Sequence, residues 1–129
     1  MSTAKRVRDL MIGDVKTVRE DQSVWEAVQI MSQHKIGAVI VLSKEKRTAG
    51  IFTERDVLMR VVAKSKDLNI PVSEVMTRDL VCAQLHDEMD SIPELMAKGG
   101  FRHVPVLDGF EPVGILSIRD VLKYTLSQA

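Results

Sequence analysis

The chain carries one nine-residue pattern twice, as GIFTERDVL at residues 50–58 and as GILSIRDVL at residues 114–122. Six of the nine positions are identical, and two more are conservative exchanges. The similarity extends upstream, where matching residues such as Val7 and Val72 lie 65 positions apart instead of 64, so the second copy is one residue shorter in an intervening hairpin. Such a repeat predicts two similar halves that pack about a pseudo-twofold axis, with equivalent surfaces meeting between them.

The composition narrows the class of protein. With 129 residues, 45% of them hydrophobic, the chain is one compact domain or two small halves that share a core. Each half alone, at roughly 60 residues, would be marginally stable, so we expect the halves to fold together. Basic and acidic residues number 18 each, and this zero net charge argues against a nucleic-acid-binding protein. The single cysteine, with no signal-like start and no apolar run of 18 residues, predicts a soluble cytoplasmic protein without a membrane span.

The residue pattern predicts an α/β fold with mixed sheets, in which each half reads strand–helix–strand–strand–helix. In the first half we expect a short helical turn, a strand, a capped helix, two strands and a helix at residues 7–12, 15–18, 23–34, 38–42, 48–52 and 53–63. The second half repeats this order at residues 72–76, 80–83, 87–99, 102–107, 112–116 and 117–127. A polar stretch, residues 64–71, links the two halves.

The repeated Gly-x-x-Thr/Ser-x-x-Asp sequence is the first place where chemistry is expected. Its glycine lets a ligand or another chain segment approach the backbone. The hydroxyl lies at a helix start, where amides and the helix dipole favour an anion. The aspartate could accept two hydrogen bonds from a vicinal diol such as a ribose. However, the pairs Thr53/Asp56 and Ser117/Asp120 are also capping boxes, which need no ligand, and both interpretations stay open.

A second candidate is the basic pair Arg102-His103, which stands where the first half has Gly37-Ala38. These donors could hold a phosphate in one half only, or they could lie at a solvated strand end. Pro105 follows inside the same strand and predicts a sheet edge or a closely approached backbone, because proline cannot donate a ladder hydrogen bond.

Other kinds of site find no support in the sequence. His34 and His86 have no metal-ligand spacing to each other or to Cys82, so we expect no metal. No nucleophile stands near a base, and there is no Walker loop and no pair of catalytic carboxylates. We therefore expect that the protein is not an enzyme and uses no catalytic cofactor.

The element order, the doubled motif and the stretch FRHVPV at residues 101–106 resemble a tandem pair of CBS (cystathionine β-synthase) domains. The resemblance covers residues 7–126 and places repeats at residues 7–63 and 72–127, joined by residues 64–71. The chain is similar to stand-alone bacterial and archaeal CBS-pair proteins. The resemblance implies a regulatory module, called a Bateman module, that binds AMP, ADP or ATP in the cleft between its repeats. In some members of the family the ligand is S-adenosylmethionine or NAD.

The resemblance also implies two ligand sites, each formed by both repeats. In site A, Ser117 and Asp120 would bind the ribose, and Thr17 and Val18 of the other repeat would frame the adenine. The phosphates would bind to the basic side chains of Arg102, His103 and Arg119. Site B would consist of Thr53, Arg55, Asp56, Cys82 and Ala83. Cys82 replaces the hydroxyl of Thr17, and the first half lacks the basic pair, so we expect site A to bind more strongly.

Two functions are compatible with these features. The chain could be a sensor, in which an adenosine ligand in the cleft changes how an unknown partner protein is regulated in trans. It could instead be a scaffold that binds no ligand and acts through assembly. The resemblance implies a homodimer formed through helices, with Met59, Val62 and residues 124–126 as candidate contacts.

Overall fold

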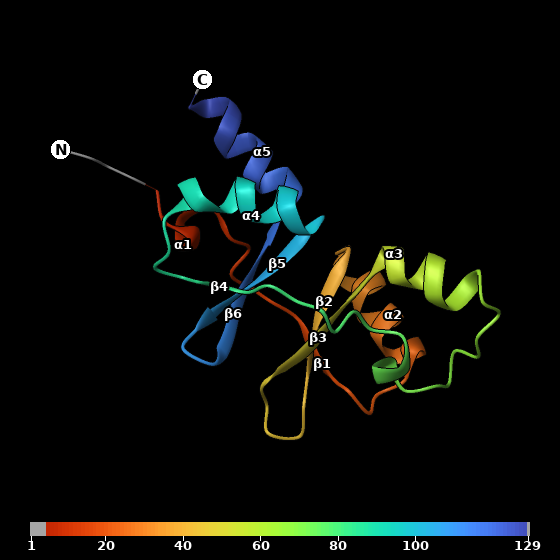
Figure 1. The fold of residues 1–129 in the computed structure, drawn as a ribbon. Coiled ribbons are helices and arrows are strands. Elements are labelled where there is room, and N and C mark those ends of the chain that lie inside the picture. Colours follow the sequence, from red (N-terminus) through yellow and green to blue (C-terminus); the bar gives the residue numbers. More distant parts are fainter. Residues whose placement is uncertain (1–4, 129) are drawn as a thin grey trace. The chain divides into compact units, whose positions relative to one another are not determined.

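The computed structural model describes residues 5–128; residues 1–4, part of the polar start of the chain, lie outside this range. The chain divides into two compact units. The middle unit is Lys16–Leu80, and the terminal unit combines Met1–Val15 with Val81–Ala129. Each unit contains one mixed three-stranded sheet with helices (Figure 1), which confirms the predicted α/β class.

The middle unit contains the first sheet, with strand order β1-β2-β3. β1 runs parallel to β2, and β2 runs antiparallel to β3. The elements are β1 (Thr17–Arg19), α2 (Val24–His34), β2 (Ala38–Leu42), β3 (Thr48–Thr53), α3 (Glu54–Asp56), the π-helix η1 (Val57–Val62) and the 3-10 helix η2 (Val72–Glu74).

The terminal unit repeats this arrangement with strand order β4-β5-β6 and the same strand directions. Its elements are α1 (Val7–Leu10), β4 (Ala83–Gln84), the 3-10 helix η3 (Met89–Ser91), α4 (Ile92–Gly99), β5 (His103–Asp108), β6 (Glu111–Ser117) and α5 (Ile118–Ser127). The short helix that begins each sequence repeat therefore belongs to the unit that carries the other repeat's sheet.

Each unit has its own apolar core beneath its central strand. In the middle unit Val39 and Val41 of β2 pack with Phe52 and Met76, all nearly inaccessible to water. In the terminal unit Val104 and Val106 of β5 do the same with other buried side chains, which include Val7, Met96 and Leu116. Burial of such side chains contributes about 1.5–3 kcal/mol each, and this explains why the middle of each central strand is apolar.

Turn and cap residues behave as their chemistry predicts. Gly100 ends α4 with a positive φ of 67°, and Gly109 forms the hairpin turn with a φ of 66°. This hairpin pairs Leu107 with Pro112, five positions apart, and closes on Asp108 and Glu111. Its counterpart closes on Leu42 and Thr48, six positions apart, so the missing residue lies in the second hairpin.

Two expected helices differ from the sequence prediction. The helix predicted at residues 53–63 is α-helical for only three residues and continues as the π-helix η1. The helix expected from residue 87 begins at Ile92, after a 3-10 turn. The capped helix expected at residues 23–34 is present: Ser23 caps α2 by accepting a hydrogen bond from the Glu26 amide (3.1 Å), and the Glu26 carboxylate accepts from Gln22 (2.8 Å).

Pro105 lies in the central strand of its sheet, so the expected sheet edge is wrong. In the middle unit the counterpart, Ile40, donates its amide to the Lys16 carbonyl (3.2 Å). Proline has no N–H to form the equivalent bond to Val81. This explains why β4 begins only at Ala83, whereas β1 begins at Thr17, the counterpart of Cys82.

Candidate functional site

The glycine of each repeated motif makes room for another chain segment. A Cβ on Gly50 would lie 2.7 Å from the Met76 Sδ and 2.8 Å from the Thr77 carbonyl oxygen. A Cβ on Gly114 would lie 2.5 Å from the Met11 Sδ and 2.9 Å from the carbonyl oxygen of the next residue. The sequence predicted that either a ligand or another chain segment approaches these glycines, and the structure places another chain segment there.

These approaching segments are held by paired backbone hydrogen bonds. In the middle unit Ile51 and Thr77 exchange two bonds of 3.0 and 2.8 Å. In the terminal unit Ile12 and Ile115 exchange two bonds of 2.9 and 3.1 Å. The repeat therefore preserves the same backbone bridge in both units, and the side chains on the bridge are what differ.

Both motif aspartates also form the capping boxes that their spacing predicts. The Thr53 hydroxyl accepts from the Asp56 amide (3.2 Å), and the Asp56 Oδ2 accepts from the Thr53 amide (3.0 Å) and hydroxyl (3.2 Å). Ser117 and Asp120 form the same three bonds at 3.1, 2.9 and 3.2 Å. In each motif one carboxylate oxygen is thus used to begin the helix.

The two motifs differ in the hydrogen bonds of the second carboxylate oxygen. The Asp120 side chain is half-buried, and its Oδ1 has no hydrogen bond within residues 5–128. Asp56 is only 5% exposed, and its Oδ1 accepts from the Thr77 hydroxyl (3.0 Å) and lies 3.5 Å from the Arg60 Nε. Asp120 therefore keeps a free acceptor, whereas Asp56 does not.

Thr77 and Arg60 were not among the residues that the sequence singled out. A residue-by-residue alignment of the repeats carries the signal, because Ile12 stands opposite Thr77 and Tyr124 stands opposite Arg60. The Ile12 side chain has no donor, and the Tyr124 hydroxyl does not bind Asp120. Tyr124 instead packs in the core of the terminal unit and donates its hydroxyl to Asp90 (2.5 Å).

The structure brings the basic pair and the second motif to one corner of the terminal unit. His103 pairs with Ser117 across β5 and β6, and the Arg102 carbonyl accepts from the Ile118 amide at the start of α5 (2.8 Å). The Arg102 side chain is exposed and His103 is half-buried. At the same positions of the middle unit, Ala38 pairs with Thr53, so the corner has no basic pair there.

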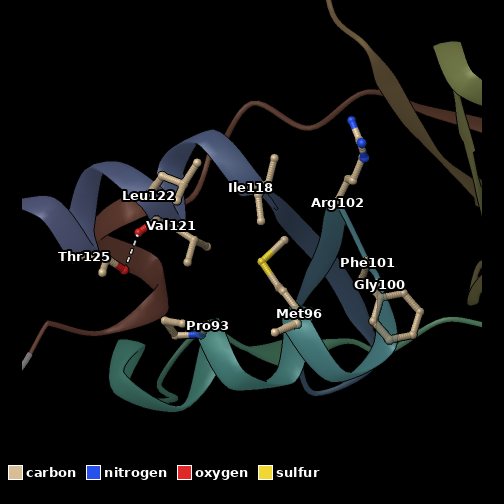
Figure 2. Close-up of a pocket in the computed structure, with 10 residues that line it drawn as sticks. Pro93, Met96, Gly100, Phe101, Arg102, Ile118, Val121, Leu122 and Thr125 are labelled. Carbon is tan, nitrogen blue, oxygen red and sulfur yellow. Dashed lines mark hydrogen bonds between the residues drawn. The ribbon is translucent and has the colours of Figure 1, made fainter.

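A groove of about 660 Å³ runs along α4 and α5 beside this corner. Figure 2 shows Met96, Ile118 and Leu122 among the apolar side chains of the groove, with Arg102 extending from the start of β5. Arg102 is the charged member of an otherwise apolar or small set of lining residues: Pro93, Met96, Ala97, Gly100, Phe101, Ile118, Val121, Leu122 and Thr125.

The other predicted site residues are divided between the units. Arg119 is exposed on the first turn of α5, and Arg55 is exposed within α3. Exposed Thr17 and buried Val18 lie on β1 of the middle unit, whereas buried Ala83 begins β4 of the terminal unit. That these residues join motif residues of the other unit stays a prediction.

Cys82 lies just before β4 and is not part of that strand, whereas its counterpart Thr17 is the first residue of β1. Although the residue is exposed, partial burial of its thiol raises the pKa above the ordinary value. The thiol is therefore protonated at neutral pH.

Among residues 5–128, no three histidine, cysteine, aspartate or glutamate side chains are grouped closely enough to hold a metal ion. In the same part of the chain, no helix is both long and apolar enough to cross a membrane.

Comparison with known proteins places this arrangement in a family. The CBS domain family matches the chain at residues 7–63 and 72–127. The CBS domain-containing protein YhcV of Bacillus subtilis is 35% identical over 121 residues, which are 94% of this chain and 86% of that protein. The crystal structure of a CBS-domain containing protein from Agrobacterium tumefaciens is 42% identical, with a TM-score of 0.81, and the match covers 95% of this chain and 94% of that chain.

A further solved structure supports the fold alone. It is a CBS domain pair in complex with methylthioadenosine and S-adenosylmethionine, 24% identical with a TM-score of 0.86. The match covers 98% of this chain and 99% of that one. The chain spans most of the length of both YhcV and the Agrobacterium protein, and it corresponds to a pair of CBS domains.

Proposed function

We propose, since this chain belongs to the CBS domain family, that it is a regulatory module whose ligand contains adenosine and binds through Asp120. AMP, ADP and ATP are the first candidates, with S-adenosylmethionine and NAD as further members of the same chemical class. The role is regulatory and not catalytic, and the ligand acts by changing how the module engages a partner protein.

The observation that carries this proposal is the free Oδ1 of Asp120. Its other oxygen is fixed by the Ser117 amide and hydroxyl, so the carboxylate is already oriented before a ligand arrives. A ribose hydroxyl that donates to the free oxygen would form a charge-assisted hydrogen bond, which contributes about 1.5–3 kcal/mol. Preorganisation of this kind lowers the entropic cost of binding.

The basic pair beside the motif supports a phosphorylated ligand. Arg102 is exposed one position before the strand residue that pairs with Ser117, the residue that caps α5. A guanidinium binds phosphate oxygens through two parallel hydrogen bonds. Phosphates near Arg102 and His103 would therefore be compatible with a ribose on Asp120. Thr17 and Val18 would frame the adenine in this proposal, and Arg119 would add a second positive charge.

We also propose that the module is a homodimer formed through its helices. Leu58 and Val62 on η1 are exposed, and so are their counterparts Leu122 and Leu126 on α5. The apolar groove beside α5 supports the same interpretation, because exposed apolar surface of this kind is common at protein interfaces. Tyr124 is not part of such a surface, since it is buried in the core.

The scaffold function remains the alternative, and one observation favours it. Both motifs complete a capping box, and both motif glycines pack against the chain itself, so the repeated sequence has a structural role without any ligand. A scaffold would use the same fold for assembly and would bind no nucleotide at the free Asp120 oxygen.

Calorimetric titration and thermal shift with AMP, ADP, ATP, S-adenosylmethionine and NAD distinguish the two functions. A specific ligand at 100 times its Kd is expected to stabilise the folded protein by about 2.7 kcal/mol. Asp120→Asn keeps the size of the side chain but removes its charge, and it should weaken binding at least tenfold. Absence of binding across the panel by a folded protein would contradict the sensor and favour the scaffold.

A further inference from the structure

The first motif differs from the second in that its aspartate is already bound by the protein itself. We infer that Thr77 and Arg60 form an internal latch on Asp56 that excludes a ribose from the first motif, so that each chain takes one adenosine ligand, through Asp120. The number of ligands rests on the proposed function, whereas the latch itself does not.

The latch joins two segments of the middle unit. The Asp56 Oδ1 accepts from the Thr77 hydroxyl (3.0 Å), and the Arg60 Nε lies 3.5 Å from the same oxygen. The Arg60 Nη1 also donates to the Met76 carbonyl (2.9 Å). One carboxylate oxygen and one guanidinium thus fasten the segment at residues 76–77 to the start of η1.

Burial makes this arrangement exclusive. Asp56 is 5% exposed, and the second oxygen is committed to the Thr53 amide and hydroxyl. A ribose could reach the Asp56 Oδ1 only by displacing the hydroxyl of the half-buried Thr77, and the hydrogen bond that is lost would offset part of the one gained. A ligand at this motif would therefore have to release the segment at residues 76–77.

The second motif serves as a control within the same chain. It has the same capping box, the same close approach at its glycine and the same backbone bridge, between Ile12 and Ile115. It lacks the two bonds to the aspartate, because Ile12 has no side-chain donor and the Tyr124 hydroxyl donates to Asp90. The difference in acceptor availability therefore comes from these two positions and not from the motif itself.

Hydrogen exchange tests the latch without any ligand. Thr77→Val removes the hydroxyl and keeps the shape of the side chain. The amides at residues 51 and 77 should then exchange at least tenfold faster relative to the amides of β2, a factor that corresponds to about 1.4 kcal/mol. Ile12→Val is the matched control, and it should leave the amides at residues 12 and 115 within twofold. Unchanged exchange at residues 51 and 77 in Thr77→Val would overturn the latch.

Titration of the intact protein with the adenosine panel tests the number of ligands. We expect one ligand per chain, lost in Asp120→Asn and retained in Asp56→Asn. Thr77→Val should add a second, weaker binding event, because it frees the Asp56 Oδ1 from one donor. Two equivalents in the unmodified protein, one of them lost in Asp56→Asn, would overturn the inference. If no adenosine ligand binds at all, the proposed function fails, and hydrogen exchange alone decides on the latch.

Discussion

Replacing Gly114 by alanine tests why this glycine is present. The new methyl group would lie 2.5 Å from the Met11 Sδ and 2.9 Å from the Ile12 carbonyl oxygen. The thioether can rotate away, since methionine is flexible. The carbonyl cannot move without disturbing the bridge in which Ile12 and Ile115 exchange hydrogen bonds of 2.9 and 3.1 Å. The substitution must therefore shift the backbone of one of the two segments.

The expected loss of stability is the sum of two destabilising contributions and one stabilising contribution. Overpacking of a filled site costs about 1–3 kcal/mol, and weakening of the two bridge bonds adds about 0.5–1.5 kcal/mol for each bond that is lost. Alanine restricts the unfolded chain, which returns about 0.4–1 kcal/mol. We expect Gly114→Ala to lower the free energy of unfolding by about 2 kcal/mol.

Urea denaturation at one protein concentration measures this loss, and Gly13→Ala is the control. A Cβ on Gly13 would meet no atom within 4 Å, and the residue does not have a positive φ. Gly13→Ala should therefore leave stability unchanged or raise it by up to about 1 kcal/mol. Equal stability of the two variants would refute the packing role and restore ligand approach as the reason for the glycine at position 114.

Two further predictions concern polar groups, and both are checked by denaturation. Asp56→Asn should destabilise the protein by about 1.5–3 kcal/mol more than Asp120→Asn, because it weakens the additional charge-assisted bond to Thr77; equal losses in urea would contradict the latch. The hydrogen bond to Asp90, aided by burial and nearby negative charge, raises the pKa of Tyr124. Because the pKa of Tyr124 is higher in the folded protein, the protonated phenol stabilises the folded state. This stabilisation is present below the pKa of the unfolded chain, about 10, and is lost as the pH rises through the pKa of the folded protein. Stability should thus fall above pH 10, less steeply in Tyr124→Phe; parallel profiles would contradict this.

Much of the fold was predictable because the relevant signals are local. The paired hydroxyl and carboxylate of each capping box are three residues apart, and the glycines at positions 100 and 109 occupy a helix end and a hairpin turn. Such signals act through a few neighbouring residues, so the sequence alone reveals them. The apolar run at residues 38–42 likewise predicts the strand β2.

Errors arose where an element depends on a distant neighbour. Pro105 suggested an edge strand, but it lies in a central strand whose neighbour, β4, begins only opposite Val106, one residue beyond the proline. The helix after Asp56 was expected to be regular, yet most of it is π-helical. In both cases the local sequence permits more than one geometry, and contacts elsewhere in the unit select between them.

The amino-acid sequence was enough to identify a duplicated α/β protein that resembles a CBS pair, with two motifs that each begin a helix. It did not distinguish the two motif aspartates, because both occupy identical local patterns. Only the tertiary structure places Thr77, 21 positions away, against Asp56, and leaves Asp120 with a free oxygen. The reason is that a capping box is satisfied within one turn, whereas the second carboxylate oxygen takes whatever donor the folded chain brings near it.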